Sequence, residues 1–90
     1  MTMITLTPEQ LYLARHALGL DWKRKSYRNN FAAEPGTPYF ETWQSMCAAG
    51  LAQQGRTIPG GLVPFRLTRA AAEAALGPGE SLDPLDFPPS

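Results

Sequence analysis

The stretch of sequence from residue 43 to residue 76 restricts the fold more than any other part of the chain. Its first part has apolar residues at helical spacing and ends at Gly50, a residue type that tolerates the left-handed backbone found just after a helix. Two short apolar segments, residues 51–54 and 62–67, then flank a glycine-rich loop, which is typical of a β-hairpin. Thr68 precedes an alanine-rich segment, which predicts a capped helix. The stretch therefore predicts a helix, a hairpin and a helix in that order.

The hairpin is preceded by two predicted helices that begin with the same pattern. The pair Thr-Pro occurs at residues 7–8 and 37–38, each time directly before apolar residues at helical spacing. The threonine hydroxyl can cap the free amides of the first turn, and proline at the first helical position loses no hydrogen bond. Since Gly19 ends the first of these segments, we expect the two helices at about residues 8–18 and 37–49.

Residues 21–37 lie between these two helices and show no regular period. Asparagine, proline and glycine interrupt the segment, and Trp22, Tyr27 and Phe31 are spaced by five and four residues. That spacing suits aromatic anchors that pin a long loop, and it equally suits one irregular turn of helix. We therefore predict a long loop here, and loops of this length often carry function.

The predicted fold class is α+β, with three helices and one β-hairpin in the order α-α-β-β-α. Residues 1–79 are expected to form a single domain, and residues 80–90, which are acidic and rich in proline, an extended tail. Three apolar residues of the tail are placed to pack back onto the body: Leu82, Leu85 and Phe87. Pro64, inside the second hairpin strand, lacks a backbone amide hydrogen and is therefore expected at a sheet edge or a bulge.

The balance of charge argues against a protein that coats nucleic acid. The 90-residue chain has eight basic and eight acidic residues, so its net charge is zero. The charges are unevenly placed, because residues 1–38 hold five basic and three acidic residues and residues 39–90 hold the reverse. A single cysteine, Cys47, cannot form an internal disulfide, and no apolar run is long enough to span a membrane, so we expect a cytoplasmic protein.

Several short motifs between residues 40 and 76 resemble those of a known fold. Gly-Leu-Ala at residues 50–52 follows a helix, Phe-Arg-Leu-Thr at residues 65–68 follows a glycine-containing loop, and an alanine-rich helix ends in Ala-Ala-Leu at residues 74–76. This order is similar to the C-terminal half of winged-helix domains, above all those of MarR- and PadR-type bacterial regulators. The resemblance implies a winged-helix-like topology and binding to double-stranded DNA. The chain departs from that family because it has room for one helix, rather than two, between its first helix and the hairpin.

Across most of its length the chain also resembles short proteins of bacteriophages and prophages. The likeness rests on Y-R-N-x-F at residues 27–31, W-x-x-M-x-x-x-G-L at residues 43–51 and G-E-S-L-x-P-x-x-F-P at residues 79–88. It implies a small protein that acts by binding a host protein or DNA, and it implies no particular chemistry.

A basic segment interleaved with aromatic residues is the strongest candidate for a binding site. Its candidate residues all lie between the first two predicted helices: Lys23, Arg24, Lys25, Tyr27 and Arg28. Basic side chains contact phosphates, and aromatic rings stack on bases. Gln44, on the polar face of the second predicted helix, and Arg56, at the tip of the hairpin loop, complete the predicted binding residues. The competing interpretation is a solvated loop whose aromatic residues anchor the core.

No arrangement of residues in the sequence indicates catalysis, a metal site or a cofactor. His16 is the only histidine, so neither a histidine pair nor a mixed cysteine–histidine zinc site can be assembled. The carboxylates of Glu9, Glu41 and Glu73 are spread over three predicted helices rather than paired for acid–base work. We therefore expect a protein that is not an enzyme and needs no cofactor.

Two functions are compatible with these observations. The first is protein–protein interaction that modulates a host macromolecule, favoured by the zero net charge and by the absence of Lys and Arg from helix 37–49. The second is DNA binding by a winged-helix regulator, with the polar face of that helix on bases and with segment 23–28 and Arg56 on phosphates. The expected partner is thus a host protein or double-stranded DNA, and a homodimer is compatible with either function.

Overall fold

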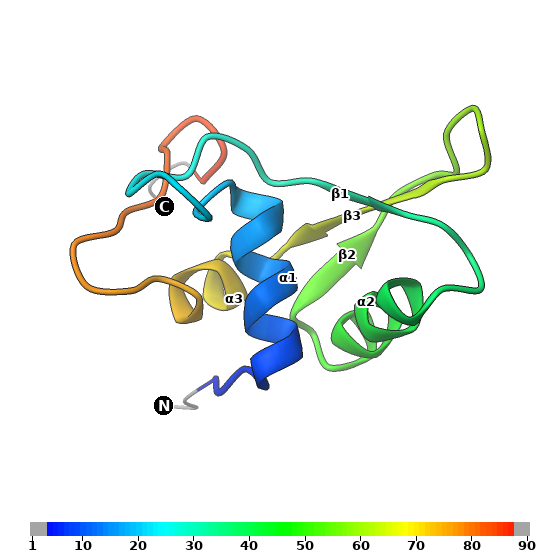
Figure 1. Ribbon diagram of the computed structural model, residues 1–90, viewed down its shortest axis with the longest axis horizontal. Coiled ribbons are helices and arrows are strands. Elements are labelled where there is room, and N and C mark those ends of the chain that lie inside the picture. The colour runs from blue at the N-terminus through cyan, green and yellow to red at the C-terminus, as the bar shows by residue number, and fades with distance from the viewer. Residues whose placement is uncertain (1–3, 88–90) are drawn as a thin grey trace.

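The computed structural model describes residues 4–87 of the chain. Its helices and strands follow one another in this order: α1 (Pro8–Leu18), β1 (Phe31–Ala33), α2 (Pro38–Ala48), β2 (Ala52–Gln54), β3 (Val63–Leu67) and α3 (Arg69–Ala74). The predicted α+β class is confirmed, as is the layout of three helices with a hairpin after the second. Figure 1 shows α1 crossing in front of the sheet, with α2 on one side of it and α3 on the other.

The structure adds one strand, β1, inside the segment predicted to be a long loop. Phe31 pairs with Phe65 and Ala33 with Val63 in antiparallel register, so the sheet has three strands in the order β1-β3-β2. This corrects the prediction that residues 21–37 lack regular structure. A strand of three residues is too short to show a period of two in the sequence, and its conformation comes from its pairing with β3.

Pro64 lies in β3, the central strand, and not at the sheet edge or bulge predicted for it. Its carbonyl accepts a hydrogen bond from the amide of Gly55 at 2.8 Å, so its nitrogen faces the same residue, just beyond the end of β2. The missing amide hydrogen therefore removes a bond where the ladder ends rather than within it. Gly55 also makes room for the proline ring, since a Cβ at this position would lie 3.0 Å from Pro64 Cγ.

The predicted helix signals are confirmed at the atomic level. The Thr7 hydroxyl accepts a hydrogen bond from Gln10 N at 3.1 Å, and Gln10 Oε1 accepts one from Thr7 N at 2.9 Å. Gly19 ends α1 in the left-handed conformation with a φ of 80°. Thr37 and Thr68 cap α2 and α3 through their side chains in the same way. Each of these contacts spans only a few residues, which is why the sequence predicts it.

An apolar core fills the space between the helices and the inner face of the sheet. Its largest fully buried apolar side chains are Leu13, Leu18, Leu20, Trp43, Met46 and Phe65. The Trp43 and Phe65 rings stack in this core with their centroids 5.5 Å apart and 17° between their planes. Burial of these large rings removes much apolar surface from water and is a main source of stability in a chain of this size.

The apolar residues of the predicted tail divide between the core and solvent. Leu82 is partly buried against the core and Phe87 is buried, as predicted. Leu85 is 90% exposed, which corrects the prediction that it packs onto the body. The backbone amides of Leu85 and Phe87 both bond to Asp83, and this turn directs Leu85 outward. The last three residues of the predicted tail, 88–90, lie outside the described residues.

Candidate binding surface

The structure places two of the basic residues that follow α1, Lys23 and Arg28, against the ring of Tyr27. Lys23 Nζ lies 4.8 Å from the centroid of that ring and 5.6 Å from the centroid of the Trp22 ring. Arg28 Cζ lies 5.2 Å from the Tyr27 centroid, and all three distances are typical of cation–π contacts. The five predicted binding residues of this segment are named the basic cluster: Lys23, Arg24, Lys25, Tyr27 and Arg28.

Backbone and side-chain contacts hold the basic cluster on the C-terminal end of α1. Tyr27 N donates a hydrogen bond to Leu18 O at 3.1 Å, and Arg28 Nη2 donates one to the carbonyl of His16 at 2.7 Å. The Tyr27 ring lies against the backbone at Gly19, where a Cβ would come within 2.2 Å of Tyr27 Cε1. The residue that ends the helix thus also makes room for the ring on which Lys23 and Arg28 pack.

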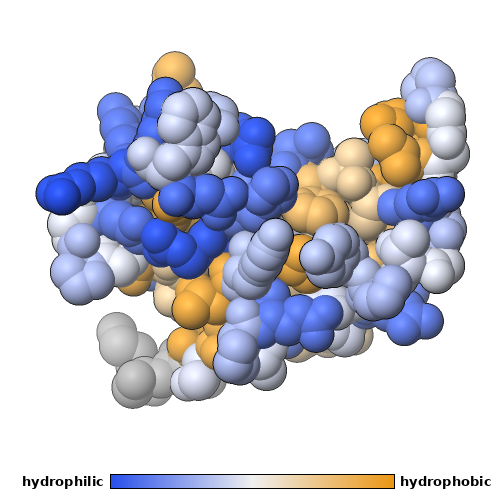
Figure 2. All heavy atoms as spheres, viewed as in Figure 1, coloured by the Kyte–Doolittle hydropathy of each residue, from blue (hydrophilic) through white to orange (hydrophobic). Residues whose placement is uncertain are grey.

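The three outermost cations of the basic cluster, Lys23, Arg24 and Lys25, are exposed to solvent. Among residues 4–87, no carboxylate forms an ion pair with any of them. Trp22 beside them is 76% exposed. Figure 2 shows hydrophilic residues gathered at the end of the molecule where Figure 1 places this segment. This end can therefore attract an acidic partner and offer it an apolar contact.

The other two predicted binding residues, Gln44 and Arg56, do not join the basic cluster. Gln44 lies on α2, and Arg56 lies in the loop between β2 and β3. Both are exposed. Figure 1 places that loop and the segment after α1 at opposite ends of the molecule, whose longest extent is 35 Å. The seven predicted residues therefore do not form one continuous surface.

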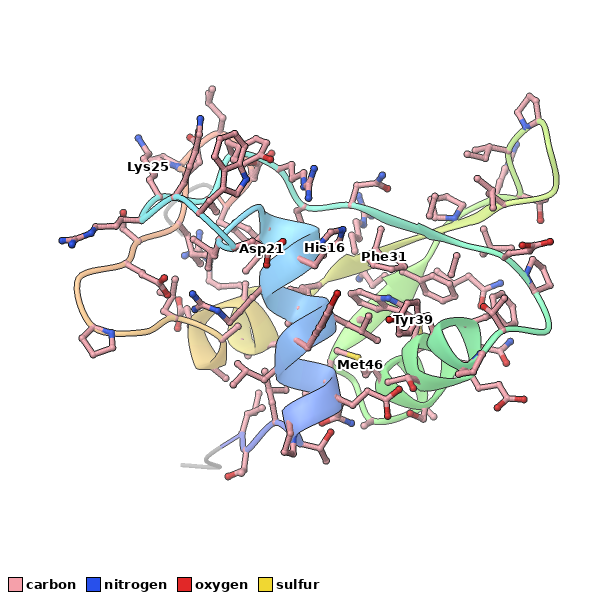
Figure 3. All side chains as sticks on the ribbon, viewed as in Figure 1. His16, Asp21, Lys25, Phe31, Tyr39 and Met46 are labelled. Atoms are coloured by element: carbon pink, nitrogen blue, oxygen red, sulfur yellow. The ribbon has the colours of Figure 1, made fainter. Side chains whose placement is uncertain are left out.

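A second surface, which no sequence motif indicates, consists of aromatic rings from α1, β1 and α2 (Figure 3). Its residues are Tyr12, His16, Phe31 and Tyr39, and they are named the aromatic patch. The Tyr12 ring stacks on the rings of His16 and Tyr39, with centroid distances of 6.3 and 6.4 Å. Phe31 lies edge-on to His16 and Tyr39, at 5.6 and 6.1 Å. Tyr12 and Tyr39 nevertheless remain 54% and 46% exposed.

Carboxylates border the aromatic patch. His16 Nδ1 forms a hydrogen bond of 2.8 Å with Asp21 Oδ2, and both side chains are nearly half exposed. Thr42 Oγ1 donates a hydrogen bond to Glu9 Oε1 at 2.8 Å and so links α2 to α1. Glu9 lies one helical turn before Tyr12, on the same side of α1. The patch is thus aromatic with an acidic border, whereas the neighbouring basic cluster is positive.

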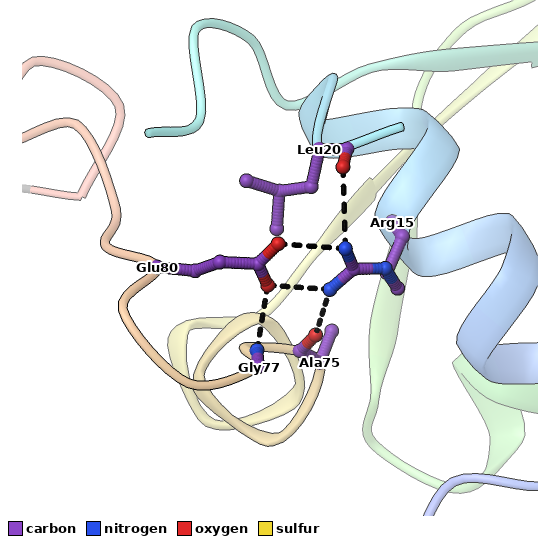
Figure 4. A network of polar contacts seen from close by, with 5 residues as sticks. All are labelled: Arg15, Leu20, Ala75, Gly77 and Glu80. Carbon is purple, nitrogen blue, oxygen red and sulfur yellow. Dashed lines mark hydrogen bonds and ion pairs between the residues drawn. The ribbon is translucent and has the colours of Figure 1, made fainter. Parts of the chain in front are cut away.

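A bidentate ion pair fastens the C-terminal segment to α1, next to the basic cluster (Figure 4). Arg15 Nη1 and Nη2 donate to the carboxylate oxygens of Glu80 at 2.5 and 2.7 Å. Arg15 also donates to the carbonyls of Ala75 and Leu20, and Gly77 N donates to Glu80 Oε1 at 2.6 Å. Hydrogen bonds from Arg15 and Gly77 lower the pKa of Glu80 to about 2, and the same carboxylate raises the pKa of Arg15. Because both charges are satisfied within the chain, the pair has a structural role.

Two open grooves lie on the outer face of the sheet, and the polar side chains that they share already bond within the chain. The grooves have volumes of about 530 and 380 Å³ and share Asn29, Gln53 and Arg66 in their walls. Asn29 Nδ2 donates to Leu67 O, and Asn29 Oδ1 accepts from Leu67 N. Arg66 Nε donates to Gln53 Oε1 at 3.0 Å. These side chains hold the strands together and are not free to orient a small molecule.

The described part of the chain holds no arrangement suited to metal binding. Among residues 4–87, no three His, Cys, Asp or Glu side chains come together in a way that could hold a metal ion. Burial raises the pKa of the Cys47 thiol, which lowers its reactivity as a nucleophile. None of the helices within this range has the length and apolar character needed to cross a membrane.

No family model, curated protein or solved structure matches the chain. Its function must therefore be inferred from the basic cluster and the aromatic patch. The two surfaces adjoin one another, because Arg28 of the first donates to the backbone of His16 in the second. They differ in what they can bind, since one presents cations and the other presents stacked rings with carboxylates nearby.

Proposed function

We propose that this chain is a small, non-enzymatic binding protein of phage or prophage type, which modulates a host protein in the cytoplasm by docking it on the aromatic patch. The observation that carries the proposal is the exposure of stacked rings. Tyr12 and Tyr39 lie against each other and still leave about half of each side chain in water. Tyrosine is enriched in protein–protein interfaces because its ring buries a large apolar area while its hydroxyl finds a polar partner.

The aromatic patch is fixed in place before any partner arrives. Phe31 packs against the buried ring of Trp43 at a centroid distance of 5.5 Å, which ties the patch to the core. The hydrogen bond between Thr42 and Glu9 holds the two helices that carry the tyrosines. Rigid aromatic side chains lose little conformational entropy on binding, so less of the free energy gained by burying them is lost to ordering.

The chemistry around the aromatic patch favours a protein partner over DNA. Glu9 and Asp21 border the patch and would repel phosphates. Exposed residues of α2 include Glu41 and Gln44, and this helix carries no basic residue. A protein partner can match such a surface with apolar side chains and hydrogen-bond donors.

Affinity capture from a bacterial lysate tests the proposal, with the wild type and a Tyr12→Ser/Tyr39→Ser variant as parallel baits. We expect at least one host protein that the wild type retains and the variant loses by about tenfold or more. A Leu11→Ser variant is the matched control, because Leu11 lies on the same helix, is 36% exposed and is not part of the patch. Equal capture of every protein by all three baits would reject docking on the patch.

A winged-helix DNA-binding protein is the second candidate, favoured by the basic cluster and by a hairpin that follows α2 directly. Two features count against it: one helix stands where that family has two, and the basic cluster lies far from the hairpin loop. Fluorescence anisotropy of a mixed-sequence duplex, at low and at physiological salt, separates the two candidates. Binding that falls steeply with salt and is lost in Lys23→Glu/Arg24→Glu/Lys25→Glu would favour DNA. Flat anisotropy at low salt would reject it.

A further inference from the structure

We propose that the end of the molecule formed by segments 22–25 and 83–86 is a self-association surface for a second copy of this chain. The second copy docks in a two-fold arrangement, so that the same surface is used on both molecules. This inference does not depend on the proposed function, because the residues of the aromatic patch take no part in it.

The two segments lie side by side although they are far apart in the sequence (Figure 1). Ser26 N donates to Ser81 O at 2.9 Å, and Ser81 N donates to Arg24 O at 2.9 Å. Asp83 N donates to the hydroxyl of Ser26 at 2.8 Å, and Ser26 is only 1% exposed. These hydrogen bonds join the segment after α1 and the C-terminal segment into one continuous surface.

This surface carries the two most exposed large apolar side chains of the described residues. Leu85 is 90% exposed and Trp22 is 76% exposed. The outward position of Leu85 is built into the fold: Leu85 N bonds to Asp83 Oδ1 at 2.9 Å, and Phe87 N bonds to Asp83 O at 3.0 Å. Phe87 is itself buried, so the turn is anchored on both sides. A leucine held in water by a hydrogen-bonded turn is available to fill an apolar site on a partner.

The charges of the surface are divided between its two segments. One segment contributes Lys23, Arg24 and Lys25, and the other contributes Asp83 and Asp86. Among residues 4–87, none of these five side chains forms an ion pair, despite the proximity of the segments. Arg24 already interacts with the Glu80 carboxylate. The charges of the other four side chains can be matched by a second molecule.

A second copy of the chain matches this distribution, in which one segment is basic and the other is acidic. A two-fold rotation sets the basic segment of one molecule against the acidic segment of the other, and it does so twice. The same rotation lets Leu85 of each copy approach the exposed Trp22 of its partner. The chain has zero net charge, so long-range repulsion between copies does not oppose the contact. A nucleic acid would match the basic segment and be repelled by the acidic one.

Sedimentation equilibrium over a range of concentrations tests the inference directly. We expect the wild type to move from the 9.8 kDa of one chain toward twice that mass as its concentration rises, and to dissociate as salt is added. Leu85→Ser should raise the dissociation constant by about tenfold or more. The matched control is Ile58→Ser, in the hairpin loop and 40% exposed, which should leave the constant unchanged. A wild type that stays monomeric at about 1 mM would overturn the inference.

A charge exchange separates a direct contact from an indirect effect on folding. Lys23→Glu/Lys25→Glu and Asp86→Lys should each be monomeric, because each places like charges opposite one another in both halves of the dimer. Mixed together, the two variants should form a heterodimer, since both opposing pairs are then of opposite sign. Arg56→Glu, at the far end of the molecule, is the control for a simple change of net charge. Failure of the mixture to associate would overturn the two-fold arrangement, with circular dichroism confirming that both variants are folded.

The Tyr12→Ser/Tyr39→Ser variant keeps this test distinct from that of the proposed function. It should lose a host protein in affinity capture and dimerise like the wild type. If it failed to dimerise while its far-ultraviolet circular dichroism stayed native, the self-association surface would have to include the aromatic patch, and the inference as stated would be wrong.

Discussion

The ring of Tyr27 lies so close to the backbone of Gly19 that a Cβ on this glycine would come within 2.2 Å of Tyr27 Cε1. Gly19 also has a φ of 80°, a conformation that side chains other than glycine rarely adopt. One residue therefore ends α1 and makes room for the ring that Lys23 and Arg28 of the basic cluster contact.

Gly19→Ala should destabilise the protein more than Gly36→Ala does. Both glycines have positive φ, 80° and 88°, so both substitutions introduce backbone strain of about 1–2 kcal/mol. Only at Gly19 does the new methyl group also displace the Tyr27 ring, and overpacking of this kind costs about 1–3 kcal/mol more. Urea unfolding of the two variants measures the difference. Equal losses of stability would mean that the Tyr27 ring can move away freely.

Glu80→Gln should lower the free energy of unfolding by about 1.5–3 kcal/mol at neutral pH, because it removes charge-assisted hydrogen bonds to Arg15. The folded state holds the pKa of Glu80 at about 2, below its ordinary value of 4.5. The stabilisation by this carboxylate is therefore complete above the ordinary pKa and is lost as the pH falls toward about 2.

Unfolding of the wild type and Glu80→Gln as a function of pH measures that stabilisation. The free energies of unfolding of the wild type and of Glu80→Gln should converge as the pH falls toward about 2. Glu73→Gln is the control, since Glu73 pairs with Arg69 at 3.5 Å with both side chains well exposed, and such pairs contribute about 0–1 kcal/mol. If the difference in the free energy of unfolding between wild type and Glu80→Gln stayed the same through the acid range, the ionised Glu80 carboxylate would not be the source of the stabilisation.

Asn29→Ala should destabilise the sheet by about 1–3 kcal/mol, because it leaves the amide and the carbonyl of Leu67 without their partner. Asn29→Asp should recover only part of the loss, since a carboxylate accepts from Leu67 N but cannot donate to Leu67 O. Hydrogen exchange at the Leu67 amide reports the effect. It should be faster in Asn29→Ala and accelerate less in Asn29→Asp, whose carboxylate still accepts from Leu67 N. Asn30→Ala is the control, because the Asn30 side chain is exposed. Unchanged exchange at Leu67 in Asn29→Ala would show that water replaces the side chain at no cost.

The Cys47 thiol should react slowly with a disulfide reagent while the protein is folded. Cys47 is partly buried on α2, and burial raises its pKa, so less thiolate is present near neutral pH. Labelling should accelerate once denaturant unfolds the chain, and the chain has only one cysteine, so the signal comes from a single site. Equal labelling rates with and without denaturant would place the thiol at the surface.

Local signals made the helices predictable. A threonine before a helix bonds to an amide three residues later, and Gly19 ends α1 through its own backbone, so these effects are contained within a few residues. The hairpin was predictable for the same reason, since two apolar segments flank a glycine-rich loop. The basic cluster could be found as well, because its five residues lie within six consecutive positions.

Contacts between distant parts of the chain were not predictable. The strand β1 exists because Phe31 and Ala33 pair with β3. A three-residue segment is too short for its sequence to predict that pairing. Pro64 was expected at a sheet edge or a bulge because it has no amide hydrogen to donate. Pairing with β1 made its strand the central one.

The sequence by itself determined where the helices begin, the hairpin and the composition of the basic cluster, because each depends on hydrogen bonds or charges among near neighbours. The third helix was expected to end in the Ala-Ala-Leu of residues 74–76, and α3 ends at Ala74. Only the tertiary structure decided which surfaces those elements share. It separated the basic cluster from Gln44 and Arg56, and it brought the four rings of the aromatic patch together from α1, β1 and α2. The fold also joined Arg15 to Glu80 across 65 positions of the chain. Such contacts form when burial of the common core brings distant segments together. Patterns among near neighbours in the sequence do not predict them.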